Sequence, residues 1–411
     1  MLEARLKSAA SLVDACEQET SQVSCSVNDH TVWFRSTDLA LKAAPEALYS
    51  AFVIPSLLQG VTLKGDLSVC SQWYANICNL TEILADAWGI PDMPPVLDTS
   101  SYSESRSQSE AQFFSGGVDS FYTLLTSTIT PRFLVLVHGF DIDLSDSVRF
   151  EHASTSLRTV ASDTGSKPCI VSTNIREHPL ISQVDWNDAH GGALAAVAHL
   201  LQPHVGAVTI PPSWHKAAGI LYGSCWQIDH LWSSRHLEIK HGEASTTRIE
   251  RVSAIADNPL AQQHLRVCWE NRAPAGNCSR CEKCIRTMLE LHIIGKLQNF
   301  EVFDSGTPIH DLIDTLPPLN TTYNFAMALR AGVDSKLESA LNRLIRRSST
   351  SSSEAIRAEN QSLRIANQQL EQEVRQLQAT IHGMSQTRLW KVATVLRRLR
   401  MNPLSHFLPE R

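Results

Sequence analysis

Two groups of residues have the types and spacing that could do chemistry: a hexapeptide at 115–120 and four cysteines between 268 and 284. The hexapeptide is Ser-Gly-Gly-Val-Asp-Ser, and it separates the apolar pair Phe113-Phe114 from a stretch with helical spacing. A strand, a glycine turn and a helix start can hold phosphate, because backbone N–H groups and the helix dipole face the anion. A tight turn without a ligand is the alternative, and the complete hexapeptide favours a nucleotide loop.

The hexapeptide lacks the Gly-Lys-Ser/Thr ending of a Walker A loop. The hydroxyl groups of Ser115 and Ser120 can donate hydrogen bonds to phosphate oxygens. Asp119 would repel phosphate unless a divalent cation lies between them, so the sequence predicts Mg²⁺. Asp119, Ser120 and Lys216 are the candidate catalytic residues, with Lys216 holding the departing pyrophosphate. The residues expected to bind the nucleotide are Ser115, Gly116, Gly117, Val118, Asp119, Ser120 and Asp141.

The four cysteines Cys268, Cys278, Cys281 and Cys284 have the spacing C-x9-C-x2-C-x2-C. Four thiolates satisfy the tetrahedral geometry of a structural Zn²⁺, and an iron–sulfur cluster is the alternative because it also takes four cysteines. Arg280 and Lys283 lie between the ligands and are expected to offset the thiolate charge. The other six cysteines are scattered, and we expect them to be buried small hydrophobic residues.

The hexapeptide resembles the SGGxDS signature of the PP-loop ATP pyrophosphatases, which cleave ATP between the α- and β-phosphates and adenylate a substrate. Together with the cysteine cluster, it resembles the 7-cyano-7-deazaguanine synthase family over residues 111–295. That resemblance implies a structural zinc and the conversion of a carboxylate to an amide and a nitrile. About 110 residues precede the loop, and the family's Tyr-Pro-Asp-Cys-Arg segment is missing. The chain also resembles an uncharacterised bacterial PP-loop group with a Cys-x-Arg-Cys-Glu-Lys-Cys cluster.

Length and composition limit the classes of protein that the chain can belong to. Its 411 residues allow two or three domains, and 43% hydrophobic residues suit a packed protein. A formal charge of −6 argues against a nucleic-acid partner. No apolar run approaches the roughly 20 residues of a membrane helix, and the first residues carry no signal-peptide pattern, so a cytoplasmic protein is expected. An N-terminal cysteine nucleophile is also missing, so ammonia would come from solution or a partner.

Alternating strand and helix patterns predict an α/β protein with a doubly wound parallel sheet of the adenine nucleotide α-hydrolase type. Strands are expected near 31–34, 133–137, 169–172 and 205–210, and helices near 45–60, 76–88, 147–164 and 192–201. The predicted domains are a small α/β domain at 1–97, a Ser-rich linker at 98–110, the nucleotide domain at 111–300, a helical extension at 301–346, a second Ser-rich linker at 347–353, a coiled coil at 354–384 and a basic amphipathic tail at 385–411.

The coiled coil follows from apolar residues that recur every seven positions, among them Leu363, Leu370 and Leu377. A homodimer through this segment is expected, and a single amphipathic helix folded back on the body is the alternative. The basic tail could contact an anionic membrane surface, or it could be an ordinary solvated helix.

The leading functional hypothesis is an ATP-dependent ligase that adenylates a small-molecule carboxylate or amide for attack by a nitrogen nucleophile. The alternatives are a tRNA-modifying PP-loop enzyme and a non-enzymatic ATP-binding scaffold. His190 and Asp229 are further candidates: His190 precedes two glycines at a helix start, and Asp229 could contact a substrate amine or amide.

Overall fold

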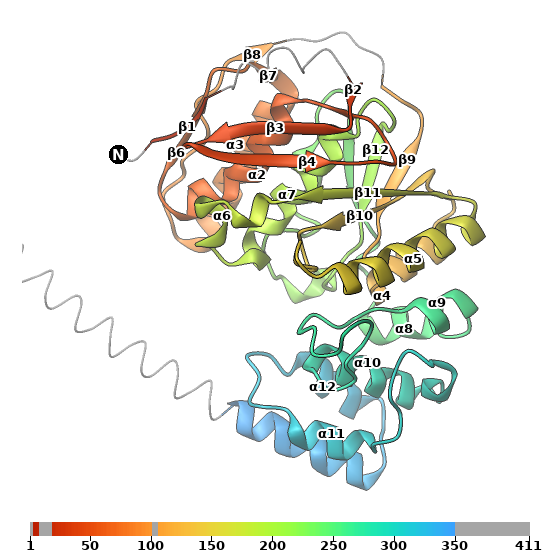
Figure 1. Ribbon diagram of the computed structural model, residues 1–411. Coiled ribbons are helices and arrows are strands. Elements are labelled where there is room, and N and C mark those ends of the chain that lie inside the picture. Colours follow the sequence, from red (N-terminus) through yellow and green to blue (C-terminus); the bar gives the residue numbers. More distant parts are fainter. Residues whose placement is uncertain (1–2, 8–18, 101–105, 350–411) are drawn as a thin grey trace, which may run out of the picture. The chain divides into compact units, whose positions relative to one another are not determined.

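A nine-stranded mixed sheet forms the centre of the protein (Figure 1) in a computed structural model that describes residues 3–7, 19–100 and 106–349. In spatial order its strands are β13 (Glu238–His241), β12 (Ala207–Ile210), β9 (Glu110–Phe113), β10 (Phe133–His138), β11 (Lys167–Thr173), β4 (His30–Arg35), β3 (Gln22–Val27), β1 (Glu3–Lys7) and β6 (Thr62–Gly65). Two small pairs join β2 (Glu19–Thr20) to β5 (Leu41–Lys42) and β7 (Val69–Cys70) to β8 (Thr99–Ser100). The predicted α/β class is therefore confirmed.

The first five strands in this order are all parallel. The chain enters at β9, continues outward through β10 and β11, and then returns to the other side of β9 for β12 and β13. All six residues of β10 are buried, as expected for a strand that is covered on both faces. Because the strands are parallel, their carboxyl ends meet at one edge, and ligands bind there where the strand order reverses.

The remaining strands continue the same sheet in a mainly antiparallel arrangement. β4 joins the parallel half through an antiparallel pairing with β11, in which Ser172 lies opposite Arg35. β3 and β4 form an antiparallel hairpin, and β1 pairs antiparallel with β3 and parallel with β6. Strands on both sides of the predicted boundary at residue 97 thus belong to one sheet, because β4 pairs with β11.

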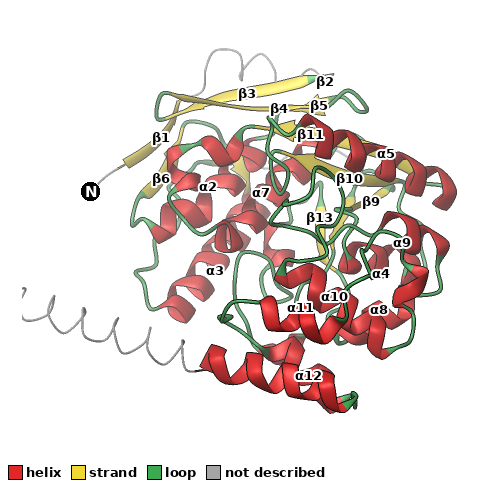
Figure 2. Ribbon diagram, turned by 60° about the horizontal axis from the view of Figure 1, so that its bottom comes forward, coloured by secondary structure: helices red, strands yellow, loops and turns green. Residues whose placement is uncertain are grey.

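Helices lie against the sheet in two groups. One group packs together over one face (Figure 2) and consists of α2 (Pro45–Leu58), α3 (Ser71–Trp88) and α7 (Trp186–Leu200). Its core includes Phe52, Trp73 and the β10 residues Phe133, Val135 and Val137. The alternating β10 residues point to the other face, where α5 (Ser147–Thr164) packs against β10 and β11. α4 (Val118–Thr126) begins within the hexapeptide, whose last three residues form its first turn.

The predicted strands and helices up to residue 210 are all present, with boundaries shifted by a few residues. The remaining helical segments are η1 (Ile175–Glu177), α6 (Pro179–Ser182), η2 (Lys216–Ala218), η3 (Asp229–Trp232), α8 (Arg248–Ile255), α9 (Pro259–His264), α10 (Glu282–Ile293), η4 (Leu297–Asn299), α11 (Ile309–Thr315) and α12 (Tyr323–Arg330). Among the described residues, no helix combines the length and apolar character needed to cross a bilayer.

The last described helix covers residues 335–349, so the first three residues of the predicted linker at 347–353 are helical. Residues 317–322 and 342–349 belong to a second compact unit, in which the Leu319 N–H donates to Ser348 Oγ at 3.0 Å. The predicted coiled coil and basic tail lie outside the described residues.

Candidate functional site

A cavity of about 440 Å³ lies at the carboxyl ends of β9, β10 and β12. This volume is within the range of small-molecule sites, roughly 300–1,000 Å³. Asp141 and all residues of the hexapeptide except Gly116 line this cavity. The structure therefore brings nearly all of the predicted nucleotide-binding residues together. The strand order reverses between β9 and β12, and the cavity therefore lies where parallel sheets usually bind ligands.

The first three residues of the hexapeptide form a tight turn after β9, and the last three begin α4. Gly116 has a φ of +78°, a left-handed conformation that favours glycine, and its carbonyl accepts a hydrogen bond from the Arg266 N–H at 2.7 Å. The Ser120 hydroxyl accepts from the Ser115 N–H at 3.1 Å and lies 3.1 Å from Ser115 Oγ. No side chain caps α4 at Gly117, so its first N–H groups stay available for an anion.

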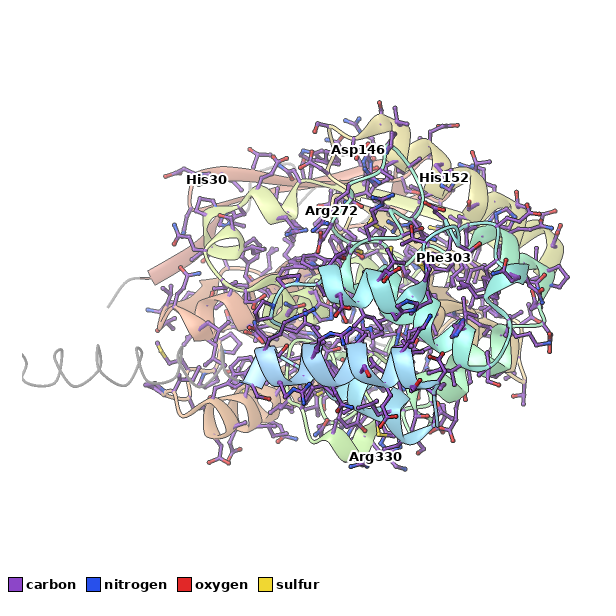
Figure 3. The ribbon with its side chains drawn as sticks, turned by 90° about the horizontal axis from the view of Figure 1, so that it is seen from below. His30, Asp146, His152, Arg272, Phe303 and Arg330 are labelled. Atoms are coloured by element: carbon purple, nitrogen blue, oxygen red, sulfur yellow. The ribbon has the colours of Figure 1, made fainter. Side chains whose placement is uncertain are left out.

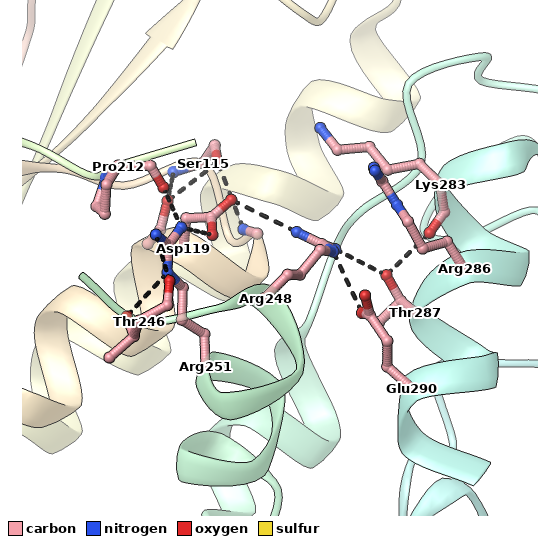
Figure 4. Close-up of polar contacts among 12 residues, drawn as sticks. Ser115, Asp119, Pro212, Thr246, Arg248, Arg251, Lys283, Arg286, Thr287 and Glu290 are labelled. Carbon is pink, nitrogen blue, oxygen red and sulfur yellow. Dashed lines mark hydrogen bonds and ion pairs between the residues drawn. The ribbon is translucent and has the colours of Figure 1, made fainter. Parts of the chain in front are cut away.

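Asp119 lies at the centre of an ion-pair network (Figure 4). Its Oδ1 accepts from Arg251 at 2.8 Å, and its Oδ2 lies 3.6 Å from Arg248. Arg248 also pairs with Glu290 at 3.2 Å and donates to Thr287 Oγ1 at 3.0 Å. The network therefore connects the hexapeptide to α8 and α10, which come from sequence segments more than 120 residues away.

α8 is built to present the two arginines of this network. Thr247 and Glu250 form a capping box: the Thr247 hydroxyl accepts from the Glu250 N–H, and the Glu250 carboxylate accepts from the Thr247 N–H. Arg248 and Arg251 are three residues apart and share a helix face. Arg251 is 1% exposed and also donates to the Pro212 carbonyl at 2.6 Å, which fixes it at the end of β12.

α10 contributes a second face of charged residues. Arg286 and Glu290 lie three and seven positions after Lys283, so the three side chains share one side of the helix. Burial lowers the pKa of Lys283 and of Arg286. Burial raises the pKa of Glu290, and the neighbouring Arg248 and Arg286 oppose that shift. The pKa of Arg248 is raised, because Glu290 and Asp119 outweigh the effect of its own burial.

The lining of the cavity is cationic, although the chain as a whole carries −6. Five cations and three carboxylates line it, which leaves two positive charges in excess when all are ionised. The cations are Arg248, Arg251, Arg266, Lys283 and Arg286, and the carboxylates are Asp119, Asp141 and Glu290. Asp141 is the carboxylate that acts most strongly on Arg266 and Lys283. Such a lining suits a ligand with several negative charges.

A second part of the lining is aromatic and surrounds His190. The rings of Phe140 and Trp186 are 4.9 Å apart, and the His190 ring lies 5.5 Å from that of Tyr222. His190 Nδ1 lies 2.9 Å from the Asn187 carbonyl, which can only accept, so Nδ1 carries the proton. Burial lowers the pKa of His190, so the ring is neutral and its Nε2 is left as an acceptor.

Close backbone packing holds this aromatic part together. A Cβ on Gly191 would lie 1.6 Å from the Gly223 carbonyl oxygen, so only glycine allows α7 to approach the 222–224 loop. The Gly223 N–H donates to the same Asn187 carbonyl at 3.0 Å. This contact places Tyr222 beside His190.

The four cysteines of the predicted metal site converge. Their Sγ atoms all lie within 4.8 Å of one another, with 3.9 Å between Cys281 and Cys268 and 4.0 Å between Cys278 and Cys284. Tetrahedral zinc–sulfur bonds of about 2.3 Å would separate the sulfurs by about 3.8 Å. The Cys284 thiol donates to Cys281 and lowers the pKa of the Cys281 thiol to about 4. This cluster could therefore hold a metal such as zinc.

Two candidates lie away from the cavity lining. Lys216 is on η2, outside the set of residues that line the main cavity. Asp229 is fully buried, and its Oδ2 accepts from Ser224 at 2.9 Å and lies 2.6 Å from His241 Nδ1. Because the serine and the histidine both contact this carboxylate, the histidine is not placed to activate the serine as in a catalytic triad. Asp229 is buried and does not belong to the cavity lining.

Sequence reasoning did not identify Arg248, Arg251, Arg266 or Arg286, and it expected Lys283 to offset thiolate charge. In the structure Lys283 lines the cavity, whereas Arg280 is 67% exposed and 4.0 Å from Asp304. The Thr247–Glu250 capping box and the helical spacing of charged residues after Cys281 were the available signals. No protein-family model, curated protein or solved structure matches this chain. Its function must therefore be inferred from the geometry of the site.

Proposed function

We propose that the chain is a PP-loop ATP pyrophosphatase that cleaves ATP to AMP and pyrophosphate. It would thereby activate a small-molecule carboxylate or amide for attack by a nitrogen nucleophile, as a ligase that forms C–N bonds. In this proposal the five parallel strands and their helices are a doubly wound nucleotide-binding sheet. The observation that carries it is the cationic cavity built on the Ser-Gly-Gly-Val-Asp-Ser turn at the reversal of strand order.

The residues of the cavity suggest how the phosphates would be held. Backbone N–H groups at the start of α4 and the hydroxyls of Ser115 and Ser120 would donate to phosphate oxygens. The cations of α8 and α10 would neutralise the charge that develops on the departing pyrophosphate, and this electrostatic stabilisation is typically the largest catalytic contribution. The assignment replaces Lys216 with cations that line the cavity.

Mg²⁺ fits the donors that are present. Asp119 and Asp141 follow neighbouring strands and both line the cavity, and carboxylate oxygens are the ligands that Mg²⁺ prefers. A bound Mg²⁺ would polarise the phosphoryl oxygens. Asp119 Oδ2 lies 3.6 Å from Arg248, beyond hydrogen-bond distance, so it can coordinate a metal while Oδ1 keeps its ion pair with Arg251.

The aromatic part of the cavity suits the acceptor substrate. Phe140, Trp186 and Tyr222 provide flat apolar surfaces, and the neutral His190 provides a hydrogen-bond acceptor. A nitrogen nucleophile must lose a proton during attack, and His190 Nε2 is a group that could accept one. The ammonia, if it is the nucleophile, would come from solution or from a partner protein.

One observation favours a second candidate, a non-enzymatic ATP-binding scaffold. Asp119 is ion-paired to Arg251 at 2.8 Å, and a carboxylate that stays in this pair holds the loop rigid without a metal. Such a protein would bind nucleotide through the same cations and leave it intact. The products formed from ATP separate the two candidates.

The decisive experiment incubates the full chain with Mg-ATP and the small-molecule fraction of a cell extract, and then measures AMP, pyrophosphate and ADP. AMP and pyrophosphate are expected in equal amounts. Asp119→Asn should reduce their formation about 10³-fold, the size of effect seen when a charge-stabilising group is lost. Asp143→Asn is the matched control, because this exposed carboxylate lies two residues from Asp141 and outside the cavity lining. ADP as the sole product would refute the PP-loop assignment, and intact ATP would favour the scaffold.

A further inference from the structure

Three of the five cavity cations lie within two residues of a cysteine ligand. Arg266 is two residues before Cys268, and Lys283 and Arg286 flank Cys284. Lys283 and Arg286 share a face of α10, and the metal ligand Cys281 is the N-cap of this helix. The segments that carry the metal ligands therefore also carry the cations.

Two of these cations are poorly compensated by the protein. Among the described residues, neither Arg266 nor Lys283 has a carboxylate within ion-pair distance, and Arg266 Nε is buried without a hydrogen-bond partner. By contrast, Arg251 is bonded to Asp119, and Arg286 lies 3.3 Å from Glu282. Holding unpaired cations in a partly desolvated cavity is costly unless a ligand supplies the negative charge.

Hydrogen bonds connect the cysteine segments to one of these cations. Asn277, next to Cys278, accepts from the N–H groups of Val267 and Cys268 and donates to the Leu265 carbonyl at 2.8 Å. The segment held in this way donates the Arg266 N–H to Gly116 in the phosphate loop. A metal bound by all four thiolates would tie this segment to the start of α10. Arg266 and Lys283, which both line the cavity, would then be held by one metal centre.

A third anchor fixes the intervening loop. Arg149 of α5 donates to the carbonyls of Asn271 and Ala273, and Gly276 lies near the His152 ring. Figure 3 labels Arg272 of this loop, in the same region as Asp146 and His152 of the α5 segment. α5 in turn packs on β10 and β11 of the sheet. The loop between Cys268 and Cys278 is therefore held against α5, which fixes the segment that carries these two metal ligands.

We propose that the cysteine metal centre and the anion site form one thermodynamic unit, in which the bound metal presents Arg266, Lys283 and Arg286 to the terminal phosphates of a polyphosphate. Each ligand then raises the affinity for the other by the same factor. The inference depends on the proposed function only for the identity of the polyphosphate as ATP. Magnesium-saturated inorganic tripolyphosphate therefore serves as a probe that is independent of catalysis.

The first test compares two glutamine variants of the full chain. Lys283 lies between Cys281 and Cys284, and Arg280 lies between Cys278 and Cys281, but Arg280 faces solvent. Lys283→Gln should weaken tripolyphosphate binding about tenfold or more, the typical cost of losing one charge-assisted hydrogen bond. Arg280→Gln should change it less than twofold. Elemental analysis should find one metal per chain in both variants, and equal affinities in the two variants would overturn the proposal.

The second test removes the metal with a chelator and restores it. Metal-free protein that keeps its far-ultraviolet circular dichroism should bind tripolyphosphate at least about tenfold more weakly, and zinc should restore the affinity. If the metal-free protein unfolds, the coupling is measured on zinc-loaded protein, as the effect of tripolyphosphate on the zinc affinity. Saturating tripolyphosphate should then raise the apparent zinc affinity about tenfold at a controlled free-zinc concentration in wild type, and by a smaller factor in Lys283→Gln.

The outcomes separate this inference from the proposed function. Metal-dependent tripolyphosphate binding without AMP formation supports the inference and refutes the enzyme. If AMP forms but the tripolyphosphate affinity does not depend on the metal, the proposed enzyme is supported and the inference is refuted. Absence of tripolyphosphate binding by fully loaded protein overturns the inference.

Discussion

The two halves of the nine-stranded sheet differ in what they contribute. The parallel half places the ends of β9, β10 and β12 around the cavity, whereas none of the described residues from 19 to 97 lines it. Parallel strands bring all of their carboxyl ends to one edge, and antiparallel strands divide their ends between two edges. A site assembled from several strand ends therefore requires the parallel half.

The antiparallel half contributes to the core instead. α2 and α3, which follow β5 and β7, bury Phe52 and Trp73 completely and pack with α7 against the shared sheet. His178 bridges the halves, because its Nε2 donates to the Val27 carbonyl at 3.0 Å and its Nδ1 accepts from the Leu180 N–H. The difference indicates that stability and ligand binding can be changed separately in this protein.

The largest expected contrast pairs a core variant with a cavity variant. Phe52→Ala should lower the free energy of unfolding by about 3–5 kcal/mol, because it leaves a cavity beneath α2. Trp214→Ala removes a partly exposed ring from the cavity and should cost less stability while weakening ATP binding. Chemical denaturation and equilibrium binding at a temperature where both variants are folded give the comparison. Weakened ATP binding by folded Phe52→Ala would show that the two halves are not separable.

Much of this arrangement could be predicted from the sequence. The apolar run of β10 and the helical pattern of α5 carry their own periodicity, and the cysteine spacing alone indicated a four-ligand site. The pairing of Thr173 with Phe34 could not be predicted, because it joins strands about 140 residues apart that have no local signal for each other. Cavity cations such as Arg251 also resemble ordinary surface residues until folding buries them.

A smaller effect on the free energy of unfolding is expected on acidification, and it tests the contribution of His178, which connects the two halves. Burial lowers the pKa of His178, and the bond to Val27 opposes this shift without cancelling it. The unfolded chain, with a histidine pKa of about 6.5, then binds more protons than the folded chain, so stability is present above that pH and is lost as the pH falls below it. The slope contributed by one such residue is at most about 1.4 kcal/mol per pH unit.

Unfolding measured at several pH values should therefore show stability decreasing below about pH 6.5. His178→Gln should be less stable at neutral pH but should lose stability less steeply on acidification. His230→Gln, at an exposed position, is the control and should keep the wild-type slope. An unchanged slope in His178→Gln would mean that this histidine does not contribute to the acid sensitivity.

The smallest effect on either half is expected from removing the segment after Ser349. Residues 354–384 lie outside the described part of the chain, and the coiled coil there stays a prediction from the apolar heptads. An isolated helix would expose this stripe to water, whereas pairing with a second chain buries it, and Asn367 at a seam position would favour a parallel dimer. Truncation after Ser349 should give a monomer with unchanged stability and ATP affinity.

In the full chain, Leu370→Asp should disrupt the dimer and Gln369→Asp, one residue off the seam, should not. If sedimentation shows the same oligomeric state for all four proteins, the heptads do not mediate self-association.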